Sequence, residues 1–412
     1  MMEKQKNVNL DCKNSLIFVL FIFAQIITMP IVQIMGSTVF FWLFIASLFI
    51  YSIYINRRIN TKFILICLIL SIIFILNAIC VPYTVKVLGL YMIFIRYGIL
   101  GIYFAMMIRD YESLMKYWNH IGVIGFLISN IYLGYYEDTN GYMNLGINLT
   151  YSFIGFSMYY YAIKGNCRFI SMILMLISFI EITILGNRSS MMICLFILVY
   201  YELLSLNKTN ILISISKLTI GFMSIIYVLL NLKNILINLI DQMNKIGIYS
   251  YSLTKYVLTL QDGLKGIITQ SSGRDDIYIL AKNIIVNSGF MPHGVGYFEY
   301  STGYIYPHNL FIEVCLDFGI FGVIGLIILF LVLLKKYITY YKQDELFKVC
   351  VATMFIYSFT RLMFSDSYWR EPLFWMNIGL VIFYQFNNKG VTNDKLNITN
   401  TRNKRKRNKK II

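Results

Sequence analysis

Apolar runs of about 20 residues recur along most of this chain, and that is the length an α-helix needs to cross the hydrocarbon core of a bilayer. Inside a membrane every backbone N–H and C=O group must be paired within the protein, so such runs predict helices. Hydrophobic residues make up 58% of the 412 residues and charged residues only 14%. Too little polar surface remains to coat a soluble core. The sequence therefore predicts an all-α polytopic membrane protein.

About twelve spans can be placed along the sequence. They cover residues 15–35, 37–55, 62–81, 87–108, 117–136, 145–163, 167–185, 189–206, 211–231, 310–334, 345–363 and 371–386. The first run is too long for the apolar part of a signal peptide, and no small-residue cleavage site follows it, so we expect it to be retained.

The chain divides into four regions on this basis. Residues 1–231 carry helices 1 to 9, residues 232–309 form one large extracytoplasmic loop, residues 310–386 carry helices 10 to 12, and residues 387–412 form a tail. A loop as long as 232–309 is usually functional. Within it, the apolar spacing from Asp276 to Val286 predicts a helix at the membrane surface, and Gly294 and Gly296 predict a tight turn.

Lysine and arginine set an orientation, because they concentrate in cytoplasmic loops. With both termini in the cytoplasm, the inner loops hold most of the basic residues, while the short outer loops carry only Lys86, Arg188 and Arg370. The tail 387–412 is strongly basic and has no apolar period. It is typical of a disordered cytoplasmic segment that touches anionic lipids or anchors the topology, so we do not expect nucleic-acid binding.

The seven cysteines lie in or beside the spans, without a CxxC motif. This pattern predicts neither a disulfide framework nor a zinc site.

Charged side chains at membrane depth are rare here, and each costs about 2.5–3.5 kcal/mol to insert. Arg96 lies near the middle of the fourth span, and the other four lie toward the outer ends of their spans: Glu181, Glu313, Asp317 and Arg361. We expect mutual ion pairs between helices for these four. For Arg96, the sequence leaves both a structural and a functional role open.

Two predicted helices begin on the outer face with polar motifs. One follows Gly186-Asn187-Arg188-Ser189-Ser190, and the other follows Pro307-His308-Asn309. A helix N-terminus presents unpaired N–H groups and a positive dipole end, which bind phosphate groups. Arg188, and Arg274 from the loop, add bidentate donors that suit a diphosphate.

His308 is the candidate general base. A histidine at a helix N-terminus near arginines is expected to be neutral, and a neutral imidazole can accept a proton from an attacking hydroxyl. The alternative is a histidine that only caps the helix or makes a hydrogen bond. We expect His120 and His293 to be structural.

Several motifs in residues 183–335 resemble the O-antigen ligase and polymerase family. Its large periplasmic loop is similar to Ser272-Gly273-Arg274-Asp275-Asp276-Ile277-Tyr278 followed by Pro292-His293-Gly294-Val295-Gly296-Tyr297-Phe298. Its helix start and the turn after it are similar to His308-Asn309-Leu310-Phe311-Ile312-Glu313 and Gly319-Ile320-Phe321-Gly322, and its outer arginine turn to Gly186-Asn187-Arg188-Ser189. The chain departs from the family pattern at Tyr278, where tryptophan is usual, and at Asn187, where serine is common.

The resemblance implies an inverting, metal-independent and cofactor-free transfer of glycan from an undecaprenyl diphosphate carrier to a sugar hydroxyl. It implies diphosphate binding by Arg188 and Arg274 and catalysis by His308. We add five candidate supporting residues: Arg96, Asn309, Glu313, Asp317 and Arg361.

The expected activity is polymerisation of lipid-linked oligosaccharide repeats into O-antigen or capsule at the outer leaflet of the bacterial cytoplasmic (inner) membrane. Membrane lipids, a flippase and a chain-length regulator are expected partners. Two alternatives remain, a ligase that transfers glycan to lipid A core and an exporter of lipid-linked oligosaccharide. Another glycosyltransferase class would place an acidic residue in the first outer loop, but Met35-Gly36-Ser37 has none.

Overall fold

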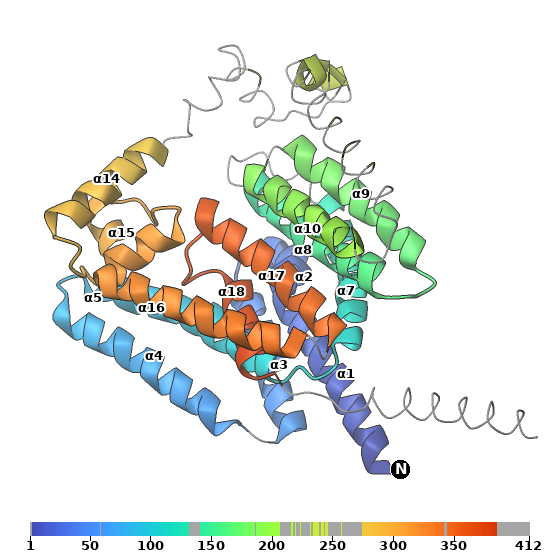
Figure 1. The fold of residues 1–412 in the computed structure, drawn as a ribbon, viewed down its shortest axis with the longest axis horizontal. Helices are drawn as coiled ribbons and strands as arrows, with labels where there is room; N and C mark the ends of the chain where they lie inside the picture. The colour runs from blue at the N-terminus through green and yellow to red at the C-terminus, as the bar shows by residue number, and fades with distance from the viewer. Residues whose placement is uncertain are drawn as a thin grey trace, which may run out of the picture.

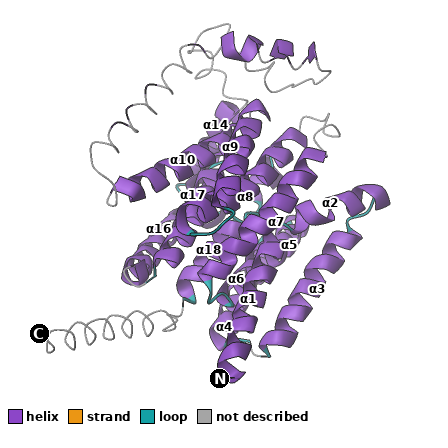
Figure 2. Ribbon diagram, turned by 90° about the vertical axis from the view of Figure 1, so that its right-hand side faces the viewer, coloured by secondary structure: helices purple, strands orange, loops and turns teal. Residues whose placement is uncertain are grey.

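The computed structural model describes residues 2–57, 59–131, 141–185, 187–206, 274–341 and 344–384, with isolated positions between 216 and 257. Every regular element in these residues is a helix (Figure 1 and Figure 2). In chain order they are α1 (Met2–Ile22), α2 (Ala24–Met35), α3 (Val39–Asn56), α4 (Thr61–Cys80), α5 (Thr84–Phe94), the π-helix η1 (Ile95–Ile99), α6 (Leu100–Met106), α7 (Tyr111–Ile131), α8 (Gly141–Ala162), α9 (Arg168–Leu185), α10 (Arg188–Leu206), α14 (Arg274–Asn287), α15 (Tyr297–Thr302), α16 (Leu310–Tyr341), α17 (Glu345–Phe364) and α18 (Pro372–Ile382).

The protein is a multi-pass integral membrane protein. Seven of the described helical runs are long and apolar enough to cross a bilayer: α3, α4, the continuous run from α5 through α6, α9, α10, α16 and α17. The bent pair α1 and α2, which meet at 53°, makes an eighth if it is one span. Large apolar side chains stand exposed along α4 and α16, including Leu65, Ile72, Ile79, Phe321 and Leu331. Such surfaces fit contact with lipid tails.

The expected count of twelve spans is not confirmed. Helix α18 has 11 residues, so it rises about 17 Å and is too short for a core of about 30 Å. Helices α7 and α8 have the length but not the apolar character. Most of the expected span at 211–231, most of residues 232–273 in the expected loop 232–309, and the tail 387–412 lie outside the described residues, so their placement stays a prediction.

Helix α8 lies inside the bundle, and helix α7 buries one face while its Ile124, Leu127 and Ile131 are exposed. Burial explains the polar residues of these two helices. They pack against each other, against α1 and α9, and against α17 (Figure 1). Trp118 of α7 is fully buried, and its indole N–H donates to the Tyr151 carbonyl at 3.0 Å. A helix that is enclosed by other helices can pair its polar groups with protein, so it needs fewer apolar residues than a helix that faces lipid.

The connections between helices lie at two ends of the bundle, and polar contacts join neighbouring connections at each end. At one end, the Ser15 hydroxyl donates to the Asp110 carbonyl at 3.0 Å, and the Tyr384 hydroxyl donates to Asp344 at 3.3 Å. At the other end of the 32-residue helix α16, the Tyr306 hydroxyl donates to the Ser365 carbonyl at 2.9 Å. The first end includes the residues that the charge distribution predicts to be cytoplasmic.

Helix α14 and the turn after it confirm the helix and the tight turn predicted for this segment, while the position of the helix at the membrane surface stays a prediction. Gly294 and Gly296 have φ of +96° and +81°, a conformation that side chains with a Cβ rarely adopt. The turn is fixed to the bundle because the Val295 N–H donates to Asn77 Oδ1 at 2.9 Å and the Tyr83 hydroxyl donates to the His293 carbonyl at 2.5 Å.

Helix α16 is interrupted at Gly319, where the segment between α14 and α15 packs against it. Gly319 has φ +66° and ψ −162°. The Ile320 N–H donates to the Phe290 carbonyl at 3.1 Å, and the His293 N–H donates to the Leu316 carbonyl at 3.0 Å. The segment between α14 and α15 is therefore held against the first half of α16, which carries the site residues at its start.

Candidate functional site

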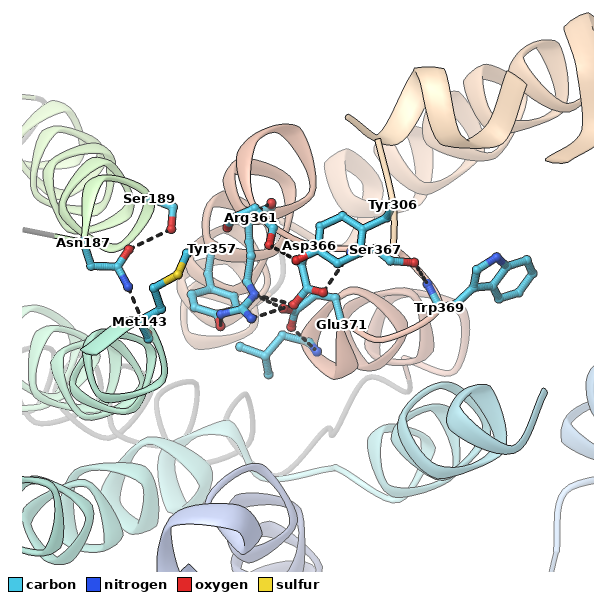
Figure 3. A network of polar contacts seen from close by, with 12 residues as sticks. Met143, Asn187, Ser189, Tyr306, Tyr357, Arg361, Asp366, Ser367, Trp369 and Glu371 are labelled. Carbon is cyan, nitrogen blue, oxygen red and sulfur yellow. Dashed lines mark hydrogen bonds and ion pairs between the residues drawn. The ribbon is translucent and has the colours of Figure 1, made fainter. Parts of the chain in front are cut away.

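A buried ion-pair network joins α17 to the connection before α18 (Figure 3). The Arg361 guanidinium donates to Asp366 Oδ2 through Nε at 2.8 Å and through Nη2 at 2.6 Å. Its Nε also lies 2.8 Å from Glu371 Oε2, and its Nη1 donates to the Tyr357 hydroxyl at 3.2 Å. One guanidinium thus contacts two buried carboxylates, offsets one negative charge and fixes the path of residues 365–371.

Glu313 and Asp317 lie one helical turn apart on α16 and hold the same connection from the other side. Glu313 Oε1 accepts from the Ser367 hydroxyl at 2.5 Å. Asp317 Oδ2 accepts from the Tyr368 hydroxyl at 2.6 Å and from the Trp369 indole at 3.0 Å. Both carboxylates are buried. Their role is to position residues 367–369.

The expected mutual ion pairs among the four intramembrane charges are wrong. Arg361 pairs with Asp366 and Glu371, and the two acids of α16 accept hydrogen bonds from neutral donors. Glu181 accepts from the Asn130 amide at 3.2 Å. The reason is that residues 365–371 fold back into the bundle and supply closer partners than the neighbouring helices do.

His308 lies at the same end of the bundle, two residues before α16. Its backbone has φ +56°, unusual for a residue with a side chain. The ring contacts Tyr306 edge-on, with centroids 4.5 Å apart. Among the described residues, none makes a hydrogen bond with its buried Nδ1. Burial, and then the positive charge of Arg274, lower the pKa of His308 from 6.5 to about 4, and attraction from Asp366 only partly opposes them. The imidazole is therefore neutral near pH 7.

Arg274 begins α14 and is partly buried. Because its charge acts on the His308 ring, the structure brings these two predicted site residues into one cluster. The Tyr278 hydroxyl, one turn along the same helix, donates weakly to the His308 carbonyl at 3.4 Å. The cluster thus combines a neutral imidazole with a guanidinium.

Arg188 begins α10 and is exposed. Its neighbours Asn187 and Ser189 lie across the Arg361 network from Tyr306 in Figure 3. The Asn187 amide donates to the Met143 carbonyl at 3.0 Å and fixes the start of α10 against α8. The start of α10 therefore lies on the other side of the Arg361 network from Tyr306 (Figure 3), and a shared site for Arg188 and His308 stays a prediction.

Asn309 has a structural role. Its Oδ1 accepts from the backbone N–H groups of Phe311 at 3.0 Å and Ile312 at 3.2 Å. This is an N-cap, which satisfies two of the donors that a helix start leaves open. His293 and His120 are separate from the cluster: His293 packs its ring 4.4 Å from that of Tyr297, and His120 is exposed on α7.

Arg96 lies in the π-helix η1, where aromatic rings surround its guanidinium. Its guanidinium carbon is 4.3 Å from the Phe41 ring centroid, 4.6 Å from that of Trp42 and 4.3 Å from that of Tyr97. Cation–π contacts of this kind stabilise a charge that has left water. Arg96 also lines a cavity of about 340 Å³ that it shares with Arg361.

Sequence reasoning missed Asp366, Ser367 and Glu371, and it treated Arg370 only as a topology marker. A signal was present, because the segment Ser365-Asp366-Ser367-Tyr368-Trp369-Arg370-Glu371 places three charges between two apolar runs. Placing a span across residues 371–386 hid the segment, since Glu371 was then only the start of a helix. In the structure it caps α18 and also pairs with Arg361.

Within the part of the chain that the structure describes, no group of three or more His, Cys, Asp or Glu side chains is arranged to hold a metal ion. Metal independence itself remains an expectation. Comparison with family models, with curated proteins and with solved structures found no match. The resemblance to O-antigen ligases and polymerases therefore rests on the motifs alone.

Proposed function

We propose that this protein is a membrane glycosyltransferase that polymerises oligosaccharide repeats carried on undecaprenyl diphosphate. The observation that supports this most directly is the proximity of His308 to Arg274 at the start of α14. A partly buried imidazole whose pKa is lowered to about 4 is unprotonated at working pH, and the adjacent guanidinium suits a leaving diphosphate.

In the proposed reaction the His308 imidazole takes the proton from a hydroxyl of the acceptor sugar. The hydroxyl oxygen then bonds to the anomeric carbon from the face opposite the carrier, and the bond from that carbon to the diphosphate oxygen breaks with inversion. The diphosphate leaves with the electron pair, and Arg274 and Arg188 neutralise its charge without a metal ion.

The proposed reaction takes place at the outer leaflet of the bacterial cytoplasmic membrane, with both termini in the cytoplasm. A flippase would deliver the donor, and a chain-length regulator would act on the product. Reporter fusions inside 232–309 and after residue 389 should label opposite sides of the membrane. Labelling on the same side would reject this topology.

The decisive experiment uses the purified protein in liposomes with a lipid-linked repeat unit. A ladder of longer products is the expected result for a polymerase. A single product on added lipid A core would instead assign a ligase, and movement of the donor across the bilayer without transfer would assign an exporter.

Variants of His308 test the role of the base in the same assay. His308→Ala should still bind the lipid-linked donor but lose about 10²–10⁴-fold in rate. His308→Gln keeps hydrogen bonding but cannot take a proton, so it should be equally slow, whereas His120→Ala should be active. An active Gln variant would reduce His308 to a positioning residue.

A further inference from the structure

A cavity of about 340 Å³ opens beside the Arg361 network, between α1, α2, α3, η1, α8 and the connection before α18. Its volume lies at the small end of the range of about 300–1,000 Å³ for small-molecule sites. That size suits one sugar residue better than an oligosaccharide. Its wall is partly apolar, with Phe21 and Ile26, and partly polar, with Gln25, Asn144 and Asn148.

Two arginines of this wall have donors without partners. Among the described residues, none accepts from the buried Nε of Arg96 or from the buried Nε of Arg370. Arg96 is held through its flat face by aromatic rings, so its in-plane N–H groups remain directed at other acceptors. A buried donor without an acceptor is costly. Both guanidiniums can therefore donate hydrogen bonds to the oxygen atoms of a bound ligand.

The local backbone holds these two arginines in place. Arg96 lies in a π-helical turn, a wider and rarer form of helix that occurs frequently at functional sites. Arg370 follows a tight turn in which its N–H donates to the Ser367 carbonyl at 3.0 Å. The same turn is fixed by the hydrogen bond from Ser367 to Glu313. Rigid placement lowers the entropy that binding must offset.

The charges of the wall favour an anion. Arg361, Arg96 and Arg370 line the cavity together with the carboxylates of Asp366 and Glu371. Arg361 is already engaged with both carboxylates, so the guanidiniums of Arg96 and Arg370 are the ones that remain for a ligand. The amides of Gln25, Asn144 and Asn148 add donors and acceptors for hydroxyl groups.

We propose that this cavity binds a sugar residue that carries an oxyanion, either a carboxylate or a phosphate, with Arg96 and Arg370 as its guanidinium donors. The amide side chains contact its hydroxyl groups. The cavity adjoins the His308 cluster through Asp366, which lines the cavity and also acts on the His308 imidazole. This inference rests on the proposed function and names its substrate class. The glycan that reaches His308 contains an anionic sugar.

Thermal unfolding of the purified protein tests binding without any transfer reaction. The probes are glucuronate, glucose 1-phosphate and glucose, each at the same concentration and at constant ionic strength. An anionic sugar should raise the unfolding temperature, and glucose should raise it much less. A shift with glucuronate alone assigns a carboxylate sugar, and a shift with glucose 1-phosphate alone assigns a phosphate. No shift with either, or an equal shift with glucose, would overturn the proposal.

Variants locate the site. Arg370→Gln and Arg96→Gln should abolish the shift. Arg370→Lys keeps the charge but not the planar donors, so it should weaken binding several-fold and serves if the Gln variants do not fold. Arg168→Gln is the matched control, because Arg168 also stacks on a tyrosine, Tyr160, at 5.0 Å but lines no part of the cavity. An undiminished shift in the Arg96 and Arg370 variants would also overturn the proposal.

The His308→Gln variant separates this inference from the proposed function. It should lose transfer but keep the full ligand-induced shift, because His308 is not part of the cavity wall. If transfer proves to be absent from the wild-type protein while the shift depends on Arg370, the cavity site stands and the proposed polymerase activity fails.

Discussion

The protonation of His308 offers a quantitative test of the site. Burial and the charge of Arg274 lower its pKa from 6.5 to about 4. A base with that pKa is about nine-tenths neutral at pH 5, whereas an unshifted histidine would be about 3% neutral there. Between pH 7.5 and pH 5, a rate limited by the neutral imidazole should therefore fall only slightly. Without the shift it should fall about 30-fold.

The sign of the accompanying effect on stability follows from the same shift. Because the pKa of the folded protein lies below the unfolded value of 6.5, the unfolded chain binds the proton first as the pH falls. The favourable contribution of the neutral side chain is complete above pH 6.5 and is lost as the pH falls toward 4. Rates must therefore be taken within the time over which the protein stays folded at each pH.

Two measurements check this prediction. The first is the initial rate of product formation in liposomes from pH 4.5 to pH 8. The second is a pH titration of the protein labelled with ¹⁵N-histidine, in which the chain has only three histidines and His308→Gln assigns the relevant signal. In Arg274→Gln the loss of a nearby positive charge should raise the pKa of His308 and move the acid limb to higher pH.

A midpoint near 6.5 in the wild-type protein would refute the reasoning, because the imidazole would then be solvated and independent of Arg274. An unchanged midpoint in Arg274→Gln would refute the electrostatic part alone and leave burial as the cause.

Three further outcomes are expected. Arg274→Lys and Arg188→Lys should each lose most transfer activity in the product-ladder assay, because an ammonium cannot replace planar bidentate donors, while Arg57→Lys should keep it; near-normal ladders from both outer variants would remove the diphosphate role. Excess chelator should leave the rate unchanged, and loss of activity that magnesium or manganese restores would point to another glycosyltransferase class. Gly319→Ala should lower the unfolding temperature, because its Cβ would lie 2.6 Å from the Phe290 carbonyl oxygen in a conformation that costs other residues about 1–3 kcal/mol. Gly325→Ala on the same helix, with open space at its Cβ, should be neutral or stabilising; equal effects of the two would refute the steric argument.

The sequence alone determined the features that depend on local chemistry. Long apolar runs can satisfy their backbone in a bilayer only as helices, so the multi-pass fold followed from composition and length. Helix α14, the turn at Gly294 and Gly296, and the helix start after His308 were predictable for the same reason. Each depends on a spacing or on a conformation that one residue type favours.

The tertiary structure decided which distant residues meet. Arg361 pairs with Asp366 and Glu371 because the chain turns back after α17, which no helical periodicity encodes. A test for apolar spans misses α7 and α8 because their polar groups pair within the protein. The Trp118 indole, for example, donates to the Tyr151 carbonyl. The arginine-lined cavity needs side chains from both halves of the chain, such as Arg96 and Arg370. Their proximity is a product of packing, since in the sequence they are isolated charges.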